Sequence, residues 1–317
     1  MKKRRIIIDT DPGIDDALAI LLALAEPRVT LEAITVTFGN CSLENAQKNA
    51  LCILELARAN QIPVARGAHR PLVQPLLLAP ETHGTTGIGY ANLPEPSLQI
   101  YPEPAVNLLI QKVMDNPGEI TIIAIGPLTN IALAVRVEPD FAPAVGEIFI
   151  MGGAIRHDGN TTPLAEFNTF CDPHAAHIVF HSGMPITLVP LDVTYQVVFS
   201  SADRDRLLEI PSPLTRFISE ATRFYMEFHN EYQQIDGCVI NDPLALAVSY
   251  LPYLVETQEL YVDVDISGGV SMGKTYADAY RLLKKEPNMR VALNVHPRKF
   301  MEYFLERMEW LAGEIGW

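Results

Sequence analysis

Cysteine is scarce in this sequence of 317 residues. The four cysteines (Cys41, Cys52, Cys171 and Cys238) form no C-x-x-C pair and no Cys/His spacing of a structural zinc site. A disulfide-stapled secreted domain is therefore not expected, and reduced thiols of a cytoplasmic enzyme fit this usage. We assign the four thiols no chemical role.

Long apolar runs are also missing. The longest, residues 17–25, is far short of the roughly 18 to 20 residues that a membrane span needs. The basic start, from Met1 to Arg5, and the three isoleucines after it resemble a secretory signal, but Asp9 and Asp11 interrupt the apolar stretch. We expect a soluble, cytoplasmic protein that has no membrane partner.

Positive charge is the third deficit. The chain has 24 Lys and Arg against 38 Asp and Glu, a formal net charge of −14, and no stripe of basic residues interleaved with aromatics. Such a surface repels phosphate backbones, so we expect no nucleic-acid partner. A neutral small molecule, or a cation held by carboxylates, suits this charge balance better.

Short apolar segments typical of buried strands alternate with segments whose apolar residues have helical spacing along the first 190 residues. The predicted strands are 5–9, 31–38, 121–125, 147–151 and 186–191, and the predicted helices are 15–26, 43–59, 128–136 and 173–181. This order predicts an α/β fold with a mainly parallel, Rossmann-like open sheet flanked by helices. Polar motifs cluster where the strands end, which is where open α/β sheets bind ligands.

The remaining third of the chain predicts a helical and small β accessory region. It contains a helix or helix pair over 201–232, strands at 259–266 and 290–295, and a terminal helix around 300–311. No repeat or linker divides the sequence, so we treat residues 1–317 as a single domain. The Pro- and Gly-rich segment 71–101 predicts a long functional loop or lid.

Four carboxylates, those of Asp9, Asp11, Asp15 and Asp16, fall within eight residues at a strand end, a Pro-Gly turn and a helix start. Helix capping explains one of them, since a capping aspartate typically contributes about 1 kcal/mol. Two like charges about 6 Å apart repel by roughly 3 kcal/mol at an effective dielectric near 20, so a cation is expected among them. Hard oxygen ligands suit Ca²⁺ or Mg²⁺, and Ca²⁺ tolerates the irregular geometry of a turn.

The segment from Asp9 to Ala17 resembles the N-terminal signature of the inosine–uridine-type nucleoside hydrolases. Further motifs follow in that family's order over roughly the first 250 residues. They are Gly39-Asn40, His83-Gly84, Gly126-Pro-Leu-Thr-Asn130, Met151-Gly-Gly153, Asn160, Ala165-Glu-Phe-Asn168, Asp172-Pro-His-Ala-Ala176, Leu191-Asp-Val-Thr194 and Asp242-Pro243.

This resemblance implies a Ca²⁺-dependent enzyme that cleaves the N-glycosidic bond of ribonucleosides and forms a homo-oligomer, a tetramer or dimer. Asp11, Asp16 and Asp242, with the carbonyl of Ile125, would bind the ion. Asp11 would also be the general base for a water bound to it. The implied substrate contacts are Asp15, Glu166 and Asn168 to the ribose hydroxyls, Asn40 and Asn160 to the sugar or nucleophile, Met151 and Phe167 against the ribose, and His83 near the base.

The sequence departs from the family at the group that would activate the leaving base. Well-studied members have a histidine immediately before the aspartate matched by Asp242, and this chain has Asn241. An amide donates a hydrogen bond but is no general acid. His83 and His229 are the candidates to replace it. The sequence leaves the base preference open, and we expect a broad or pyrimidine-leaning one.

Two other functions remain alternatives at this point. The Asp9-Thr-Asp11 pair also occurs in phosphohydrolases with an aspartyl nucleophile and Mg²⁺. A calcium-dependent nucleoside-binding protein without catalysis would explain Asn241. Finally, His174, His177 and His181 share one predicted helix, but without an H-E-x-x-H pattern they predict a solvated or packed helix face.

Overall fold

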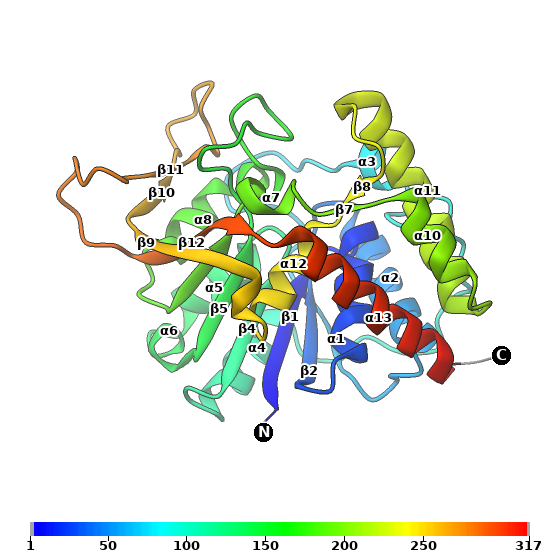
Figure 1. Cartoon of the computed structure of the whole chain (residues 1–317). Coiled ribbons are helices and arrows are strands. Elements are labelled where there is room, and N and C mark those ends of the chain that lie inside the picture. Colours follow the sequence, from blue (N-terminus) through cyan, green and yellow to red (C-terminus); the bar gives the residue numbers. More distant parts are fainter. Residues whose placement is uncertain (1–2, 316–317) are drawn as a thin grey trace.

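An eight-stranded sheet forms the centre of the computed structural model, which describes residues 3–315 (Figure 1). Its strands lie in the order β3-β2-β1-β4-β5-β6-β12-β9, and every neighbouring pair is parallel except β12 and β9. The strands are β1 (Arg4–Thr10), β2 (Val29–Val36), β3 (Val64–Arg66), β4 (Ile120–Ala124), β5 (Glu147–Met151), β6 (Ile186–Val189), β9 (Val255–Leu260) and β12 (Met289–Val295). The predicted mainly parallel open sheet is confirmed.

Helices cover both faces of this sheet and enclose two apolar cores. Alternate residues of β1 point to opposite faces, so Ile6 and Ile8 join one core while Ile7 joins the other. The first face carries α1 (Ile14–Ala25), α2 (Leu43–Leu56), α11 (Pro213–Gln233), α12 (Asn241–Val248) and α13 (Pro297–Ile315). The second carries α4 (Ala105–Met114), α5 (Thr129–Val137), α6 (Phe141–Ala144) and α8 (Pro173–Phe180).

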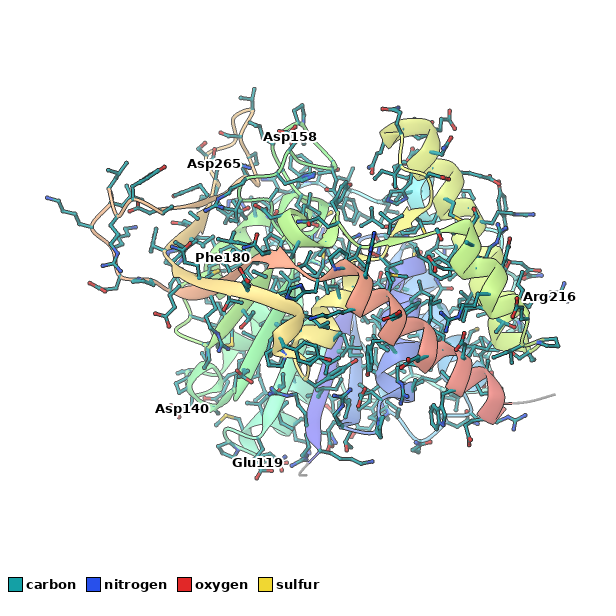
Figure 2. All side chains as sticks on the ribbon, viewed as in Figure 1. Glu119, Asp140, Asp158, Phe180, Arg216 and Asp265 are labelled. Atoms are coloured by element: carbon teal, nitrogen blue, oxygen red, sulfur yellow. The ribbon has the colours of Figure 1, made fainter. Side chains whose placement is uncertain are left out.

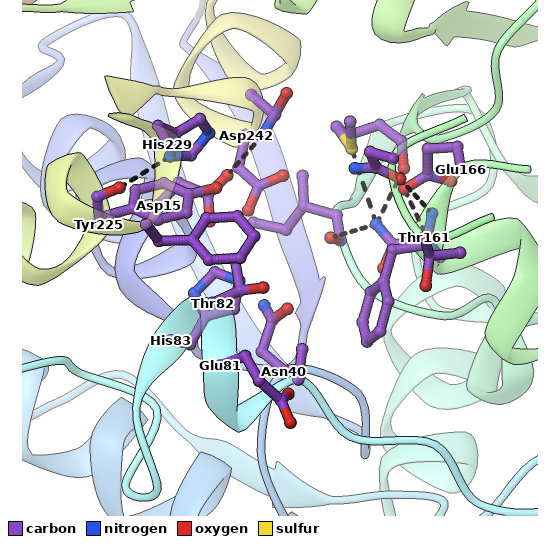
Figure 3. Close-up of a pocket in the computed structure, with 18 of the residues that line it drawn as sticks. Asp15, Asn40, Glu81, Thr82, His83, Thr161, Glu166, Tyr225, His229 and Asp242 are labelled. Carbon is purple, nitrogen blue, oxygen red and sulfur yellow. Dashed lines mark hydrogen bonds between the residues drawn. The ribbon is translucent and has the colours of Figure 1, made fainter. Parts of the chain in front are cut away.

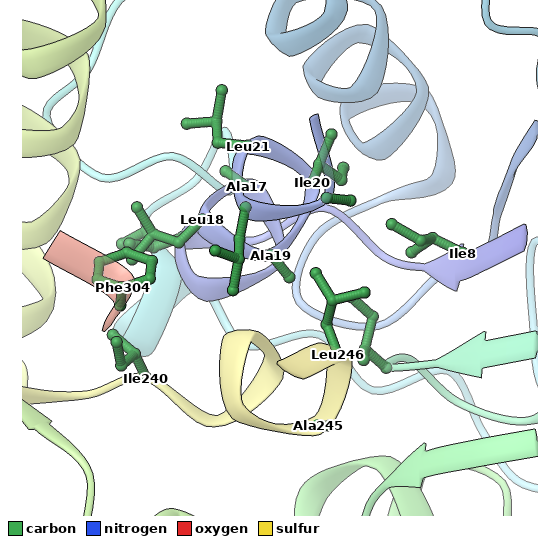
Figure 4. Close-up of a cluster of buried hydrophobic side chains, with 14 of the residues drawn as sticks. Ile8, Ala17, Leu18, Ala19, Ile20, Leu21, Ile240, Ala245, Leu246 and Phe304 are labelled. Carbon is green, nitrogen blue, oxygen red and sulfur yellow. The ribbon is translucent and has the colours of Figure 1, made fainter. Parts of the chain in front are cut away.

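Helix α1 is buried on almost every side. It packs against α12 and α13, with Leu18 and Leu246 among the fully buried side chains between them (Figure 4). Truncating such a leucine to alanine typically costs about 2 to 5 kcal/mol. This packing fixes the start of α1, where Asp15 and Asp16 lie, relative to the start of α12, where Asp242 lies.

The strand order reverses beside β1. The chain runs from β1 outward to β2 and β3, then returns to place β4 on the other side of β1. Open parallel sheets bind ligands at such a switch point, beyond the carboxyl ends of the strands. The loop after β1 begins with Asp11, and the loop after β4 begins with Ile125.

The remaining elements are helices, a 3₁₀ turn and two small sheets outside the central sheet. They are α3 (Pro80–His83), α7 (Phe167–Cys171), α9 (Leu191–Thr194), α10 (Ser201–Leu208), the 3₁₀ turn η1 (Pro252–Leu254), and the two-stranded sheets β7 (Val198–Phe199) with β8 (Cys238–Val239) and β10 (Val262–Val264) with β11 (Thr275–Ala277). Charged side chains such as Asp140 and Arg216 project from the outside (Figure 2).

The predicted elements match the structure closely where apolar periodicity is strong. The region 201–232 is a helix pair, α10 and α11, and the strand expected at 259–266 is divided between β9 and β10. Helix α4 and the short strand β3 were not predicted. Met1 and Lys2, part of the suspected signal, and the last two residues of the expected domain lie outside the described residues. Within residues 3–315, no helix has the length and apolar character of a membrane span.

Candidate active site

A cavity of about 220 Å³ opens at the carboxyl ends of β1, β4 and β5. In Figure 3, Asp15, Asp242, Tyr225 and His229 lie on one side of it, and Glu166 and Thr161 lie on the other. Its lining comprises Asp15, Asn40, Leu77, Leu78, Ala79, Glu81, Thr82, His83, Ile125, Met151, Asn160, Thr161, Glu166, Phe167, Asn168, Tyr195, Tyr225, Phe228, His229, Gln233, Asn241 and Asp242.

Asp16 lies beneath the cavity and is fully buried at the start of α1. Its Oδ1 accepts a hydrogen bond from the Thr10 hydroxyl at 2.5 Å, and its Oδ2 accepts from the Gly13 amide at 3.0 Å and from Asn40 Nδ2 at 2.7 Å. These bonds join β1, the Pro-Gly turn and the loop after β2 to one carboxylate. Asp16 is therefore held rigidly.

Asp11 is also fully buried, and only one of its oxygens has a partner. The Asn40 amide donates to Oδ2 at 2.6 Å, while Oδ1 has no hydrogen-bond partner among residues 3–315. A Cβ at position 39 would overlap this carboxylate, and Gly39 also has a φ of +154°, so only glycine lets the loop approach so closely. Burial, reinforced by the charge on Asp16, raises the pKa of Asp11 well above its ordinary value.

Three carboxylates converge beside Asp11. Asp15, Asp16 and Asp242 each offer an oxygen, and these oxygens lie within 4.8 Å of one another. Burial, with the charges of the neighbouring aspartates, raises the pKa of Asp15 and of Asp242. No basic side chain between residues 3 and 315 forms an ion pair with any of the four. This compact group includes Asp15, which the resemblance gave to the ribose, and leaves out Asp11, whose carboxylate turns toward Asn40.

Asp9, the first of the four N-terminal aspartates, has a structural place. Its Oδ2 accepts from the Thr35 hydroxyl at 2.5 Å and from Asn130 Nδ2 at 2.9 Å, and Asn130 Oδ1 in turn accepts from the Ala68 amide. Burial raises the pKa of Asp9 to about 7. The residue links β1, β2 and α5 and lies outside the cavity lining.

The side of the cavity opposite Asp15 is polar and built from β4, β5 and α7. Glu166 caps α7, and its carboxylate accepts from the amides of Gly153, Asn168 and Thr169 at 2.8 to 3.0 Å. Asn168 Nδ2 donates to the Ile125 carbonyl at 3.0 Å. The Asn160 side chain accepts from the Phe167 amide at 2.9 Å.

His83, His229 and the ring of Tyr225 form a third part of the cavity lining, which we call the far wall. His83 is 5% exposed, and its Nδ1 accepts from the Ile14 amide at 3.1 Å, so a neutral ring carries its hydrogen on Nε2. His229 Nδ1 lies 2.8 Å from the Tyr225 carbonyl, which only accepts, so Nδ1 holds the hydrogen there. Burial lowers the pKa of His83 to about 3 and that of His229 to about 4.

Asn241 faces the carboxylates rather than the far wall. Its Nδ2 donates to Asp15 Oδ2 at 3.1 Å, and its Oδ1 is buried with no hydrogen-bond partner in the described residues. The amide therefore positions Asp15 directly.

The residues expected at the site come together in the structure. All the expected substrate-contacting residues line the cavity, as do His83, Asn241, Ile125 and Asp242, while Asp11 and Asp16 lie buried beneath it. Tyr195 and Gln233 also line the cavity and were not predicted from the sequence, whereas His229 was one of two candidate histidines. Of the aromatics on α11, Tyr225 and Phe228 line the cavity, whereas Tyr232 is 62% exposed. Helical spacing was the available signal for these two, and Tyr195 had none.

Comparison with known proteins agrees with this geometry. The family model described as inosine-uridine preferring nucleoside hydrolase matches residues 6–302. The pyrimidine-specific ribonucleoside hydrolase RihA of Salmonella gallinarum is 38% identical over 308 residues, which are 97% of this chain and 99% of that protein.

Solved structures are similar over the same length. A purine-preferring ribonucleoside hydrolase from Gardnerella vaginalis has a TM-score of 0.93 and 33% identity, with 97% of this chain and 99% of that chain covered. The plant nucleoside hydrolase PpNRh1 has a TM-score of 0.91 and 36% identity, with 96% and 98% covered.

These matches exclude the aspartyl phosphohydrolase that the Asp9-Thr-Asp11 pair left open. Motif order, sheet topology, cavity lining and relatives agree on one assignment. The chain belongs to the inosine–uridine preferring nucleoside hydrolase family and is a ribonucleoside hydrolase that cleaves an N-glycosidic bond.

Proposed function

We propose that this enzyme hydrolyses ribonucleosides to ribose and free base with Ca²⁺ as its cofactor. One observation supports the metal: buried carboxylates converge, and no basic side chain within residues 3–315 is paired with them. Like charges at such separations repel by several kcal/mol at an effective dielectric near 20. A divalent cation removes this repulsion.

The donor set fits calcium. Asp16 and Asp242, together with Asp11 and the Ile125 carbonyl, offer only oxygen, and Asp11 Oδ1 is a buried acceptor with no partner in the described part of the chain. Ca²⁺ takes six to eight oxygen ligands in irregular arrangements, whereas Mg²⁺ demands a near-ideal octahedron. When bound, the ion supplies orientation of the attacking water and lowers its pKa.

Asp11 is the proposed general base. Its Oδ1 is the carboxylate oxygen left free to accept a proton, because Oδ2 is taken by the Asn40 amide. The raised pKa that burial gives Asp11 makes it a better proton acceptor than a solvated aspartate. A positioned base typically contributes about 10² to 10⁴ in rate.

The carboxylates and Asn168 act on the sugar. Departure of the base leaves positive charge on the ribose ring, and Asp15 and Glu166 face that position from opposite sides of the cavity. Asn241 and the backbone amides around Glu166 hold both carboxylates in place, so little reorganisation accompanies the reaction. Asn40, Asn160, Met151 and Phe167 complete the proposed ribose contacts.

The far wall acts on the base by hydrogen bonding. With a pKa of about 3, His83 is protonated in only about one molecule in 10⁴ at pH 7. The neutral ring still offers Nε2–H as a donor. His229 donates its Nδ1–H to the Tyr225 carbonyl, so its Nε2 is a hydrogen-bond acceptor.

A wall of neutral groups favours a pyrimidine. Uracil departs with its negative charge on carbonyl oxygens, and hydrogen-bond donors stabilise that charge without full proton transfer. The 38% identity to a pyrimidine-specific relative supports the same preference. Faster turnover of inosine than of uridine would contradict it.

Two further properties belong to this proposal. We expect a homo-oligomer, a tetramer or dimer, which analytical ultracentrifugation tests directly. We also expect a cytoplasmic location, which fractionation of the source cells would check.

Release of reducing sugar from a nucleoside panel tests the function itself. The wild type should release ribose from uridine, lose that activity in a chelator, and regain it with Ca²⁺ but not with an equal concentration of Mg²⁺. Unchanged turnover after exhaustive chelation would overturn the metal requirement. Tight nucleoside binding without ribose release would instead favour the non-catalytic binding protein.

A further inference from the structure

A second group of potential metal ligands lies outside the active-site cavity, on helix α8. His177 and His181 are one helical turn apart on α8, and β10, which contains Asp263, packs against this helix (Figure 1). Their ligand atoms lie within 4.8 Å of one another. We propose that His177, His181 and Asp263 form a binding site for a divalent transition-metal ion of the zinc class. None of the family motifs described above includes this group.

Hydrogen bonding fixes the tautomer of His181 in the form that binds a metal. Its Nδ1 lies 2.9 Å from the His177 carbonyl oxygen, which can only accept, so Nδ1 carries the hydrogen. The lone pair of the neutral ring is then on Nε2. A backbone carbonyl in this role is the usual partner of a metal-binding histidine.

This lone pair faces a carboxylate. His181 Nε2 is 3.5 Å from Asp263 Oδ2, and the Tyr261 hydroxyl lies 3.2 Å from the first and 3.1 Å from the second. The hydroxyl has one hydrogen and satisfies only one of these two acceptors. The Lys285 ammonium donates to the same hydroxyl at 2.6 Å and does not bond either acceptor, whereas a cation bound between His181 Nε2 and Asp263 Oδ2 would satisfy both.

The distances suit a tetrahedral ion. With bonds of about 2.0 to 2.1 Å, ligand atoms of a zinc site lie roughly 3.3 to 3.4 Å apart. His177 Nδ1 lies 2.9 Å from Asp263 Oδ1, and His181 Nε2 lies 3.5 Å from the other oxygen, Oδ2, so the two distances to the carboxylate lie on either side of that value. Two imidazoles and one carboxylate favour Zn²⁺ or Co²⁺ over Ca²⁺, in contrast to the all-oxygen set at Asp16.

The group is also accessible. The side chains of His177 and His181 are 39% and 34% exposed, whereas that of Asp263 is 10% exposed. A groove beside them is lined by Asp263 and by the loop that contains Asp265, labelled in Figure 2. An ion can enter from solvent, and water can occupy the fourth position.

An ion at this site would tie α8 to β10, which pairs with β11 in a two-stranded sheet. This hairpin supports the wall of the active site, because the Thr169 hydroxyl donates to the Gly273 carbonyl at 3.0 Å and the Ala154 amide donates to the Thr275 hydroxyl at 2.8 Å. Binding to the folded state alone raises the unfolding temperature.

Cobalt titration of tag-free enzyme tests the proposal. With Ca²⁺ present in large excess to occupy the acidic cluster, the wild type should bind one Co²⁺ per chain with the intense visible absorption of tetrahedral cobalt, and Zn²⁺ should displace it. The variants Asp263→Asn and His181→Ala are compared with His69→Ala, an exposed histidine elsewhere. Asparagine at 263 keeps an acceptor for the Val264 amide, so the fold is preserved.

We expect affinity to fall at least about tenfold in Asp263→Asn, to be lost in His181→Ala and to be unchanged in His69→Ala. Uridine hydrolysis in Ca²⁺ should be equal in His181→Ala and wild type, which shows that the variant is folded. Absence of Co²⁺ binding by the wild type would overturn the site. Binding as tight in Asp263→Asn as in the wild type would do the same, because it would reduce the site to a bare histidine pair.

Discussion

The side of the cavity that we assign to the sugar and the side that we assign to the base, called the sugar side and the base side below, are built from different parts of the fold. The sugar side consists of strand ends and helix starts, where Asp11, Asp16 and Ile125 are held by backbone amides and buried neighbours. The base side consists of side chains on α3 and α11, with His83 and Tyr225 at its centre. Relatives named for pyrimidine and for purine substrates share the family and the fold. The comparison suggests that the sugar side supplies the chemistry and the base side tunes the substrate.

The largest predicted effect is on the sugar side. Asp11→Asn keeps an oxygen for the Asn40 amide but cannot accept a proton, so kcat/KM should fall about 10³-fold or more for every nucleoside. Reducing-sugar assays measure this. Asp9→Asn is the matched control: it should lower the free energy of unfolding by about 1 to 2 kcal/mol, through weaker bonds to Thr35 and Asn130, with turnover per folded molecule within a few-fold of wild type. More than a tenth of wild-type activity in Asp11→Asn would contradict its role.

The ribose hydroxyls provide the next test. Sites built to bind a hydroxyl reject analogues that lack it, because their buried polar groups are left unpaired. We therefore expect kcat/KM for 2′-deoxyuridine to be at least about 10²-fold below that for uridine. Equal rates on the two substrates would remove Asp15 and Glu166 from the proposed sugar contacts.

A smaller effect is expected on the base side. His83→Asn keeps an acceptor for the Ile14 amide and removes the Nε2–H donor, so uridine turnover should fall about 10- to 100-fold, in line with loss of one charge-stabilising hydrogen bond. His229→Asn keeps the donor to the Tyr225 carbonyl and should lower turnover less than about fivefold. Equal losses in the two variants would show that the cavity needs its shape rather than the His83 donor.

The smallest effect is the pH dependence of stability. The folded pKa of His83, about 3, lies below its unfolded value of 6.5, so below pH 6.5 the unfolded state binds a proton that the folded state excludes. Between pH 7.5 and 5.5 the wild type should therefore lose about 1.4 kcal/mol of stability that His83→Asn does not lose. Urea unfolding of both proteins at the two pH values measures this difference. An identical change in both would show that His83 titrates normally in the fold.

The fold could be predicted where local patterns are strong. Runs such as 147–151 contain the apolar residues of a buried strand, and the observed strand has the same bounds. Helix α4 follows a Pro-rich loop and has only a short apolar face, and β3 has three residues, so neither gave a clear pattern. The strand order depends on contacts between distant segments, which local periodicity does not encode.

The site residues also fall into those that the sequence could predict and those that it could not. The acidic cluster lies within eight residues and was predictable, because its repulsion is evident from spacing alone. The bond from Asn241 to Asp15 spans 226 positions, and that from Asn130 to Asp9 spans 121. Asp263 lies 86 positions from His177, so the sequence predicted only an ordinary helix face there. Residues that act through such distant partners could be assigned only in three dimensions.

One experiment tests directly whether the sugar side performs the chemistry and the base side assists departure of the base. A nitrophenyl riboside has a leaving group that departs without help, so its cleavage depends on the sugar side alone. We predict that Asp11→Asn lowers kcat/KM about equally for uridine and for the nitrophenyl riboside, whereas His83→Asn lowers it for uridine and leaves the nitrophenyl riboside within about threefold of wild type. Equal losses on both substrates in His83→Asn would contradict the account.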